Sequence, residues 1–198
     1  MKQFKLLSFV CCLMLAVVVS SCLSDDDNNQ NTGLTNAEKA LCYTVVAGDY
    51  SGKLMYYNIE QKIDTVDIAW RIPSDSILTV LQFPSAAVAG CVSSEPLKEA
   101  LLEQPAQPLN CYIGFISASP VEFLINPLPL TYNLHYSDAD HQVQLLFYVN
   151  NTYSFGTYDA TTKRLGLQLL VGALYVDGQQ SSYLSRNALF VFQSNPKE

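Results

Sequence analysis

The chain has 198 residues, of which 49% are hydrophobic and 15% charged, and its formal net charge is −7 at pH 7. This length allows one domain or two small ones. The composition is too apolar for a disordered chain and too acidic for a nucleic-acid-binding protein, so both of those classes are excluded.

The first 21 residues have the pattern of an export signal. Two lysines precede an apolar run over residues 6–19. The run is shorter than the roughly 20 apolar residues that a membrane-spanning helix needs. It ends in Val19-Ser20-Ser21-Cys22, which resembles the lipobox of bacterial lipoproteins. The resemblance implies that residues 1–21 are removed and that Cys22 carries the lipid anchor; an ordinary signal peptide with a chance cysteine is the alternative.

Residues 22–33 are predicted to form an acidic, polar tether. The run Asp25-Asp26-Asp27 resembles the tether of Bacteroidota lipoproteins. This implies an outer-membrane protein exposed at the cell surface, with a periplasm-facing anchor or a merely solvated linker as alternatives. Cleavage takes away two of the 11 basic residues and none of the 18 acidic ones, which leaves a net charge of −9. We expect lipid head groups to repel this domain, so that it contacts the membrane through its anchor alone.

The remaining residues, 34–198, are predicted to form a single β-rich domain. A short helix over residues 37–46 comes first, because Thr35 and Glu38 have capping-box spacing. Strands of alternating polarity follow, and a helical insertion lies between Pro84 and Gln104. The predicted strands cover residues 50–57, 66–70, 77–81, 111–117, 121–125, 143–149, 153–158, 165–176 and 188–192.

About nine strands at short spacing predict an antiparallel β-sandwich or a partly open lipocalin-like barrel. Tight turns are expected at Asn150-Asn151 and Asp177-Gly178, because these residues accept positive φ angles. The segment Gly48-Asp49-Tyr50-Ser51-Gly52 resembles the Gly-x-Trp start of lipocalin-like (calycin) barrels, although Tyr stands where that family has Trp. The resemblance implies a closed lipocalin barrel as the alternative fold.

A second resemblance covers nearly the whole chain after Cys22. It is carried by residues 75–80 (Asp-Ser-Ile-Leu-Thr-Val), Phe83-Pro84, residues 147–151 (Phe-Tyr-Val-Asn-Asn) and residues 170–178. Together these segments look like an uncharacterised family of secreted Bacteroidota lipoproteins of about this length. That family has no assigned activity, so the resemblance implies a location and no mechanism.

Three cysteines remain in the predicted mature chain besides Cys22, namely Cys42, Cys91 and Cys111. Their apolar neighbours favour buried thiols, and one disulfide with a thiol left over is the alternative. No Cys-x-x-Cys pair is present, which argues against a zinc or thioredoxin-like site.

His135 and His141, the only histidines, stand with Asp138 and Asp140 in one cluster of metal-ligand residue types. A Ca²⁺ or Zn²⁺ site is one hypothesis, and a polar hairpin loop is the other. The sequence has no nucleophile elbow, zincin motif or phosphate-binding glycine loop. We therefore expect no enzyme and no cofactor, with a hydrolase centred on the acidic cluster as a remote alternative.

Aromatic residues make up 11% of the chain and suggest a binding role. Trp70, Tyr50, Tyr56 and Tyr57 could form a platform for sugar rings or line a barrel around a small apolar ligand. The same residue types also suit the half-buried face of a sheet. We expect a binding or accessory module for a glycan or small apolar ligand. A structural or protein-interaction component of an outer-membrane assembly is the alternative, which burial of these rings in the core would favour.

Two tripeptides, Asp64-Thr65-Val66 and Asp75-Ser76-Ile77, resemble the O-glycosylation acceptor of Bacteroidota. The resemblance implies that Thr65 and Ser76 carry glycans and face solvent.

Overall fold

Helix α2 (Asn36–Val46) is the first element of the computed structural model, which describes residues 33–150, 152–185 and 188–197. These residues belong to one unit, Gly33–Glu198, which has its own core. The Glu38 N–H donates to the Thr35 hydroxyl, and the Thr35 N–H donates to the Glu38 carboxylate. The predicted capping box is therefore present, and it begins the helix one residue before the predicted start.

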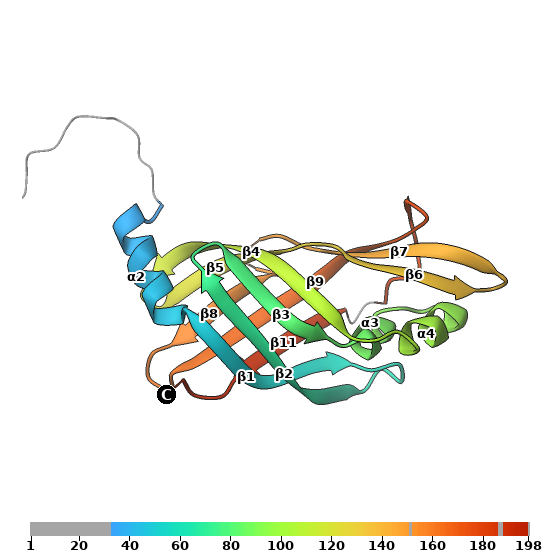
Figure 1. Ribbon diagram of the computed structural model, residues 1–198, viewed down its shortest axis with the longest axis horizontal. Coiled ribbons are helices and arrows are strands. Elements are labelled where there is room, and N and C mark those ends of the chain that lie inside the picture. Colours follow the sequence, from blue (N-terminus) through green and yellow to red (C-terminus); the bar gives the residue numbers. More distant parts are fainter. Residues whose placement is uncertain (1–32, 151, 186–187, 198) are drawn as a thin grey trace, which may run out of the picture. The chain divides into compact units, whose positions relative to one another are not determined.

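Eight antiparallel strands of the described chain close into a barrel (Figure 1). Strands β1 to β5 pair in chain order, followed by β8 and β9. Strand β11 closes the ring, because Val191 lies opposite Met55 of β1 and also opposite Gln168 of β9. The barrel strands are β1 (Gly48–Tyr57), β2 (Ile63–Ser74), β3 (Ile77–Phe83), β4 (Gln107–Ala118), β5 (Val121–Pro127), β8 (Phe155–Asp159), β9 (Arg164–Val176) and β11 (Leu189–Ser194).

Strands β6 (Leu130–Tyr136), β7 (Ala139–Phe147) and β10 (Gln179–Gln180) lie outside the barrel. Strand β9 is long enough to serve both parts. Up to Leu170 it pairs with β8 or β11, and from Val171 onward it pairs with β7 and then β10. The β6–β7 hairpin therefore extends the sheet beyond the barrel (Figure 1).

Alternation along each barrel strand decides which side chains fill the interior. In β2, Trp70 and Ile72 are buried whereas Asp67 and Arg71 are exposed, so the two parities of the strand form its inner and outer faces. Removal of this apolar surface from water is the main source of stability. The largest fully buried side chains are Trp70, Phe83, Phe123, Phe190, Phe192, Leu54, Ile72, Leu78, Leu97, Leu101, Leu109 and Ile125.

The predicted helical insertion consists of two helices, α3 (Ser85–Gly90) and α4 (Glu95–Leu102). A proline in the first turn of α4 suits a helix start, because proline lacks the N–H that this turn leaves unpaired. Leu97 and Leu101 of α4 are buried, and Leu102 is exposed. Figure 1 shows α3 and α4 at the end of the barrel opposite α2.

The closed barrel corrects the prediction of a sandwich or partly open barrel. Pairing of β11 with both β1 and β9 leaves the wall without an open side. Strand β6 was missing from the predicted elements, although Leu130, Tyr132 and Leu134 alternate with polar residues there. Residues 136–140, for which a polar hairpin loop was one hypothesis, are mostly strand. Only Ser137 and Asp138 form the turn, and both have positive φ angles. The Asp177-Gly178 turn is confirmed, with φ angles of 53° and 76°.

The predicted signal peptide, the lipidation site Cys22 and residues 22–32 of the predicted tether lie outside the described residues. Within the described ranges, no helix has the length and hydropathy needed to span a membrane.

Candidate functional site

Aromatic rings fill the barrel interior at the predicted ligand platform. Trp70 is 0% exposed, the Tyr50 ring stacks on it with centroids 5.7 Å apart, and Phe192 meets it edge-on at 5.8 Å. The Tyr50 hydroxyl donates to the Val46 carbonyl at 2.7 Å, and burial raises the pKa of this phenol above its ordinary value. Trp70 and Tyr50 therefore pack the core rather than lining an open groove.

Helices cover both ends of this interior (Figure 1). At the α2 end, the Lys197 ammonium donates to the Val45 and Ala47 carbonyls at 3.1 and 2.6 Å. A cation at this position stabilises the C-terminal end of the helix dipole. At the other end, α3 lies so close to β1 that a Cβ at Gly90 would clash with the Tyr57 carbonyl. Buried side chains thus occupy the interior between the two ends.

Tyr57 faces outward, in a patch of apolar side chains that crosses β1, β2 and β11. We call this set the outer apolar patch; its members are Met55, Tyr57, Ile63, Leu189 and Val191. They line a shallow pocket of about 190 Å³, and the buried Tyr56 reaches its floor. Tyr57 lies opposite Ile63, and Met55 lies opposite Val191, so the strand register assembles the patch. The β11 members were missed by sequence reasoning because the β1–β11 pairing joins residues far apart in the chain.

The four residues of the predicted metal site lie in three separate places. His135 Nδ1 lies 2.7 Å from Asp140 Oδ1, and His141 Nδ1 lies 2.7 Å from Asp177 Oδ2. Asp140 and His141 are neighbours in β7, so their side chains point to opposite faces of the hairpin. Asp138 occupies the turn. The hairpin therefore does not bring the four predicted ligands together.

Asp177 was not among the predicted site residues, and the register of β7 and β9 brings it to His141. Its carboxylate accepts hydrogen bonds from the His141 ring and from the Gln142 N–H, which hold the pKa of Asp177 below its ordinary value. The Tyr136 ring packs on His141 with centroids 4.4 Å apart. No group of three or more His, Cys, Asp or Glu side chains that could hold a metal ion occurs in the described part of the chain.

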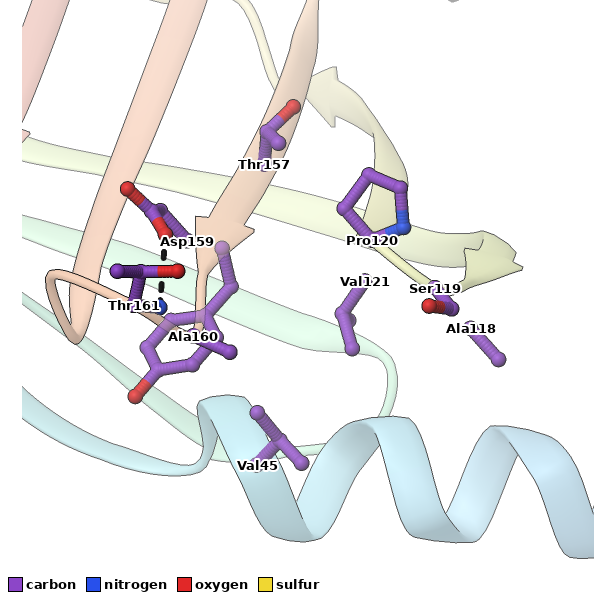
Figure 2. Close-up of a pocket in the computed structure, with 10 residues that line it drawn as sticks. Val45, Ala118, Ser119, Pro120, Val121, Thr157, Asp159, Ala160 and Thr161 are labelled. Carbon is purple, nitrogen blue, oxygen red and sulfur yellow. Dashed lines mark hydrogen bonds between the residues drawn. The ribbon is translucent and has the colours of Figure 1, made fainter.

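A larger surface pocket, of about 490 Å³, lies beside α2 (Figure 2). Val45 projects from α2 toward it, and Ser119 and Pro120 line it from the turn between β4 and β5. The end of β8 contributes Thr157 and Tyr158. The wall is thus mostly apolar, and its polar groups are hydroxyls and one carboxylate, a mixture that is typical of small-molecule sites.

Asp159 is the one acidic residue among those that line this pocket. Its carboxylate accepts a hydrogen bond from the Thr162 hydroxyl at 2.7 Å. It accepts another from the Thr161 N–H at 2.8 Å (Figure 2). These bonds hold the pKa of Asp159 below its ordinary value. The carboxylate therefore stabilises its own turn.

The three predicted buried thiols, Cys42, Cys91 and Cys111, are buried and unpaired, which confirms the prediction. Thr65 lies on the outward face of β2 and Ser76 in the turn before β3, and both are exposed. Their exposure is compatible with glycosylation, which stays a prediction.

Comparison with known proteins gives a family and no activity. No curated protein and no solved structure matches the chain. The model of a family described as a domain of unknown function, DUF4840, matches residues 45–176, from the end of α2 to the end of β9. The lipoprotein, Bacteroidota and lipocalin resemblances stay predictions. A match over this much of the chain shows that the protein belongs to the DUF4840 family of domains of unknown function.

Proposed function

We propose that this protein is a lipid-anchored component of the outer membrane, with its barrel domain exposed at the cell surface. The support is the lipobox-like sequence that ends at Cys22, followed by the acidic run at residues 25–27. Two or more acyl chains on one cysteine anchor a protein stably in a bilayer.

Metabolic labelling with an alkyne fatty acid tests the anchor. The protein should incorporate the label, and Cys22→Ala should abolish incorporation; labelling that persists in the variant contradicts the proposal. Protease treatment of intact cells then separates the two orientations. A surface-exposed domain is digested without permeabilisation, and a periplasm-facing domain is digested only after it.

We further propose that the domain is non-catalytic and acts as an interaction component of an envelope assembly, without enclosing a small ligand. The observation that carries this proposal is the filled barrel interior, with Trp70 and its aromatic neighbours packed together and helices over both ends. Barrels that enclose a ligand need a vacant interior. The outer apolar patch supports an interaction role for the outer surface of the barrel, because Ile63 in this patch is 68% exposed. Contiguous exposed apolar patches are typical of interaction surfaces.

The size of the native complex tests this role. Mild detergent extracts of the native membrane are separated by size-exclusion chromatography, and the protein is detected by antibody. We expect it to elute with a partner, and Ile63→Ser to shift it to the size of the free protein. Asp67→Ser is the matched control, because Asp67 lies on the same face of β2 and Lys53 is its one ion-pair partner among the described residues. Elution of the wild type as the free protein, or an equal shift in both variants, contradicts the proposal.

A glycan or small apolar ligand is the second candidate, and the pocket of about 490 Å³ beside α2 is the observation that favours it. A thermal-shift screen against glycans, lipids and bile acids tests it, because a ligand that binds the native state raises the melting temperature. A ligand of this pocket should lose its effect in Thr157→Trp, which fills the pocket, and keep it in Thr65→Trp, on the outward face of β2. Such a result would replace the interaction role by ligand binding.

A further inference from the structure

Within the described chain, one edge of the β6–β7 hairpin, that of β6, pairs with no other strand, and the hairpin turn shows which β6 residues face this edge. In a two-residue hairpin the residues that flank the turn share hydrogen bonds, so Tyr136 bonds to Ala139 across the Ser137-Asp138 turn. Every second residue of β6 then bonds to β7, and the residues between them direct their N–H and C=O groups away from it.

The outward-directed residues of β6 are Thr131, Asn133 and His135. The Thr131 carbonyl confirms this direction, because it accepts a hydrogen bond from the Gln107 side chain at 3.4 Å. Asn133 and His135 are exposed, and their backbone groups have no partner among the described residues. Two consecutive positions of this edge therefore present a donor and an acceptor each to solvent.

Natural proteins protect such edges with charged side chains, proline, bulges or very short strands. Strand β6 has none of these features. Its seven residues, Leu-Thr-Tyr-Asn-Leu-His-Tyr, contain no Lys, Arg, Asp, Glu or Pro, and they pair with β7 without a register shift. The edge is thus suited to accept a further strand.

Charge indicates what kind of strand it would accept. The β6–β7 hairpin has two acidic residues, Asp138 and Asp140, and no Lys or Arg, and helix α4 has Glu95, Glu99 and Lys98. Lys98 is already paired with Glu95 on α4, the helix that packs against β6. Asp140, 94% exposed at its side chain, lies opposite His135 beside the edge. A second copy of this acidic domain would be repelled, whereas a basic segment would be attracted.

We propose that the β6 edge binds an extended, basic segment of a partner protein by strand addition. Side chains of the added strand would alternate between two faces. On the face of Asn133, His135 and Asp140 they would be Lys or Arg. On the face of Tyr132 and Leu134, which are buried toward the core, they would be apolar. The proposal rests on the interaction role proposed above but uses a surface separate from the outer apolar patch.

Fluorescence anisotropy with labelled heptapeptides tests this edge in the full-length protein, purified in detergent. The probe is Lys-Val-Lys-Val-Lys-Val-Lys, compared with its Glu-Val counterpart and with a Lys-Val peptide N-methylated at every second backbone nitrogen. Hydrogen–deuterium exchange, measured by mass spectrometry on residues 130–136, reports whether the edge amides become protected. We expect binding and protection with the first probe only, and weaker binding at higher salt.

Two substitutions of Asn133 distinguish the contribution of its backbone N–H to peptide binding from that of its side chain. Asn133→Pro removes the outward N–H and leaves the bonds to β7 in place, because proline is tolerated on the free side of an edge strand. Asn133→Ala removes the same side chain and keeps the N–H. We expect Asn133→Pro to weaken binding by about tenfold and Asn133→Ala by less than about threefold.

Equal affinities of the two variants would overturn the strand-addition geometry, and equal binding of the Glu-Val peptide would overturn the basic partner. Protection of residues 130–136 that grows with protein concentration without any peptide would assign the edge to a second copy of this chain. If no peptide binds while Ile63→Ser still dissociates the native complex, this proposal fails and the proposed function stands.

Discussion

The packing of Phe123 over Gly156 gives the sharpest test of the filled barrel. Gly156 of β8 faces the interior and Phe123 of β5 is fully buried against it, with Phe115 edge-on at 5.7 Å. A Cβ at position 156 would meet the Phe123 ring, at only 2.5 Å from Cε2 and 2.9 Å from Cε1. Ordinary contacts begin at 3.4 Å, so in Gly156→Ala the ring must move by about 1 Å inside a packed core.

Overpacking of this kind costs about 1–3 kcal/mol of unfolding free energy, and the closeness of the ring places Gly156→Ala at the upper end. For a domain of this size, about 3 kcal/mol lowers the melting temperature by about 6–12 °C. Urea unfolding gives the free energy, and the fluorescence of Trp70, the one tryptophan, reports the core directly. Circular dichroism must give the same midpoint if unfolding is two-state.

Gly114→Ala is the matched control, because Gly114 lies on β4 with no atom within 4 Å of the added Cβ. We expect this variant to be neutral or more stable by up to about 1 kcal/mol. Phe123→Leu should relieve the clash, so that Gly156→Ala costs less in that background than in the wild type. Equal effects of the two glycine substitutions, or strict additivity with Phe123→Leu, would refute the packing.

Three further predictions address local features. Thr35→Ala removes the N-cap acceptor of α2 and should lower the unfolding free energy by about 1 kcal/mol in urea titrations; an unchanged midpoint contradicts the capping role. Burial raises the pKa of the Cys91 thiol to about 12 and also raises that of Cys111. A thiol reagent at pH 8 should therefore label both cysteines only after unfolding. Rapid labelling of the native protein would show that the two thiols are accessible. The pKa of Asp159 is lower in the folded state than its ordinary value of 3.8. The Asp159 carboxylate therefore stabilises the folded state above pH 3.8, and this stabilisation is lost as the pH falls through the lower folded pKa. The stability difference between wild type and Asp159→Ala should therefore shrink between about pH 6 and about pH 2; a difference independent of pH would exclude the carboxylate as its source.

Local features of this protein could be predicted because their causes are local. The α2 start follows from Thr35 and Glu38, three residues apart. The turn at Asp177-Gly178 follows from residue types that accept positive φ angles. The common face of Trp70 and Ile68 follows from their parity in one strand. Each of these involves residues close enough in the chain for periodicity or turn chemistry to determine the result.

Barrel closure was decided by tertiary structure. Parity shows which residues of a strand share a face. The parity is the same whether that face packs on a second sheet or on the far side of its own sheet. The difference lies in the pairing of β11 with β1 and β9, which joins Val191 to Met55 across most of the domain. No local pattern encodes such a long-range register.

The candidate sites depend on the same long-range pairing. His141 was predicted beside Asp138 and Asp140, but strand alternation turns it away from Asp140 and the β7–β9 register gives it Asp177. The outer apolar patch likewise exists only because closure brings Leu189 next to β1. The sequence by itself determined which residues of a strand share a face, where helix α2 begins and where an export signal is predicted. Tertiary structure alone decided which distant residues meet, because strand pairing is selected by the free energy of the whole barrel rather than by any one segment.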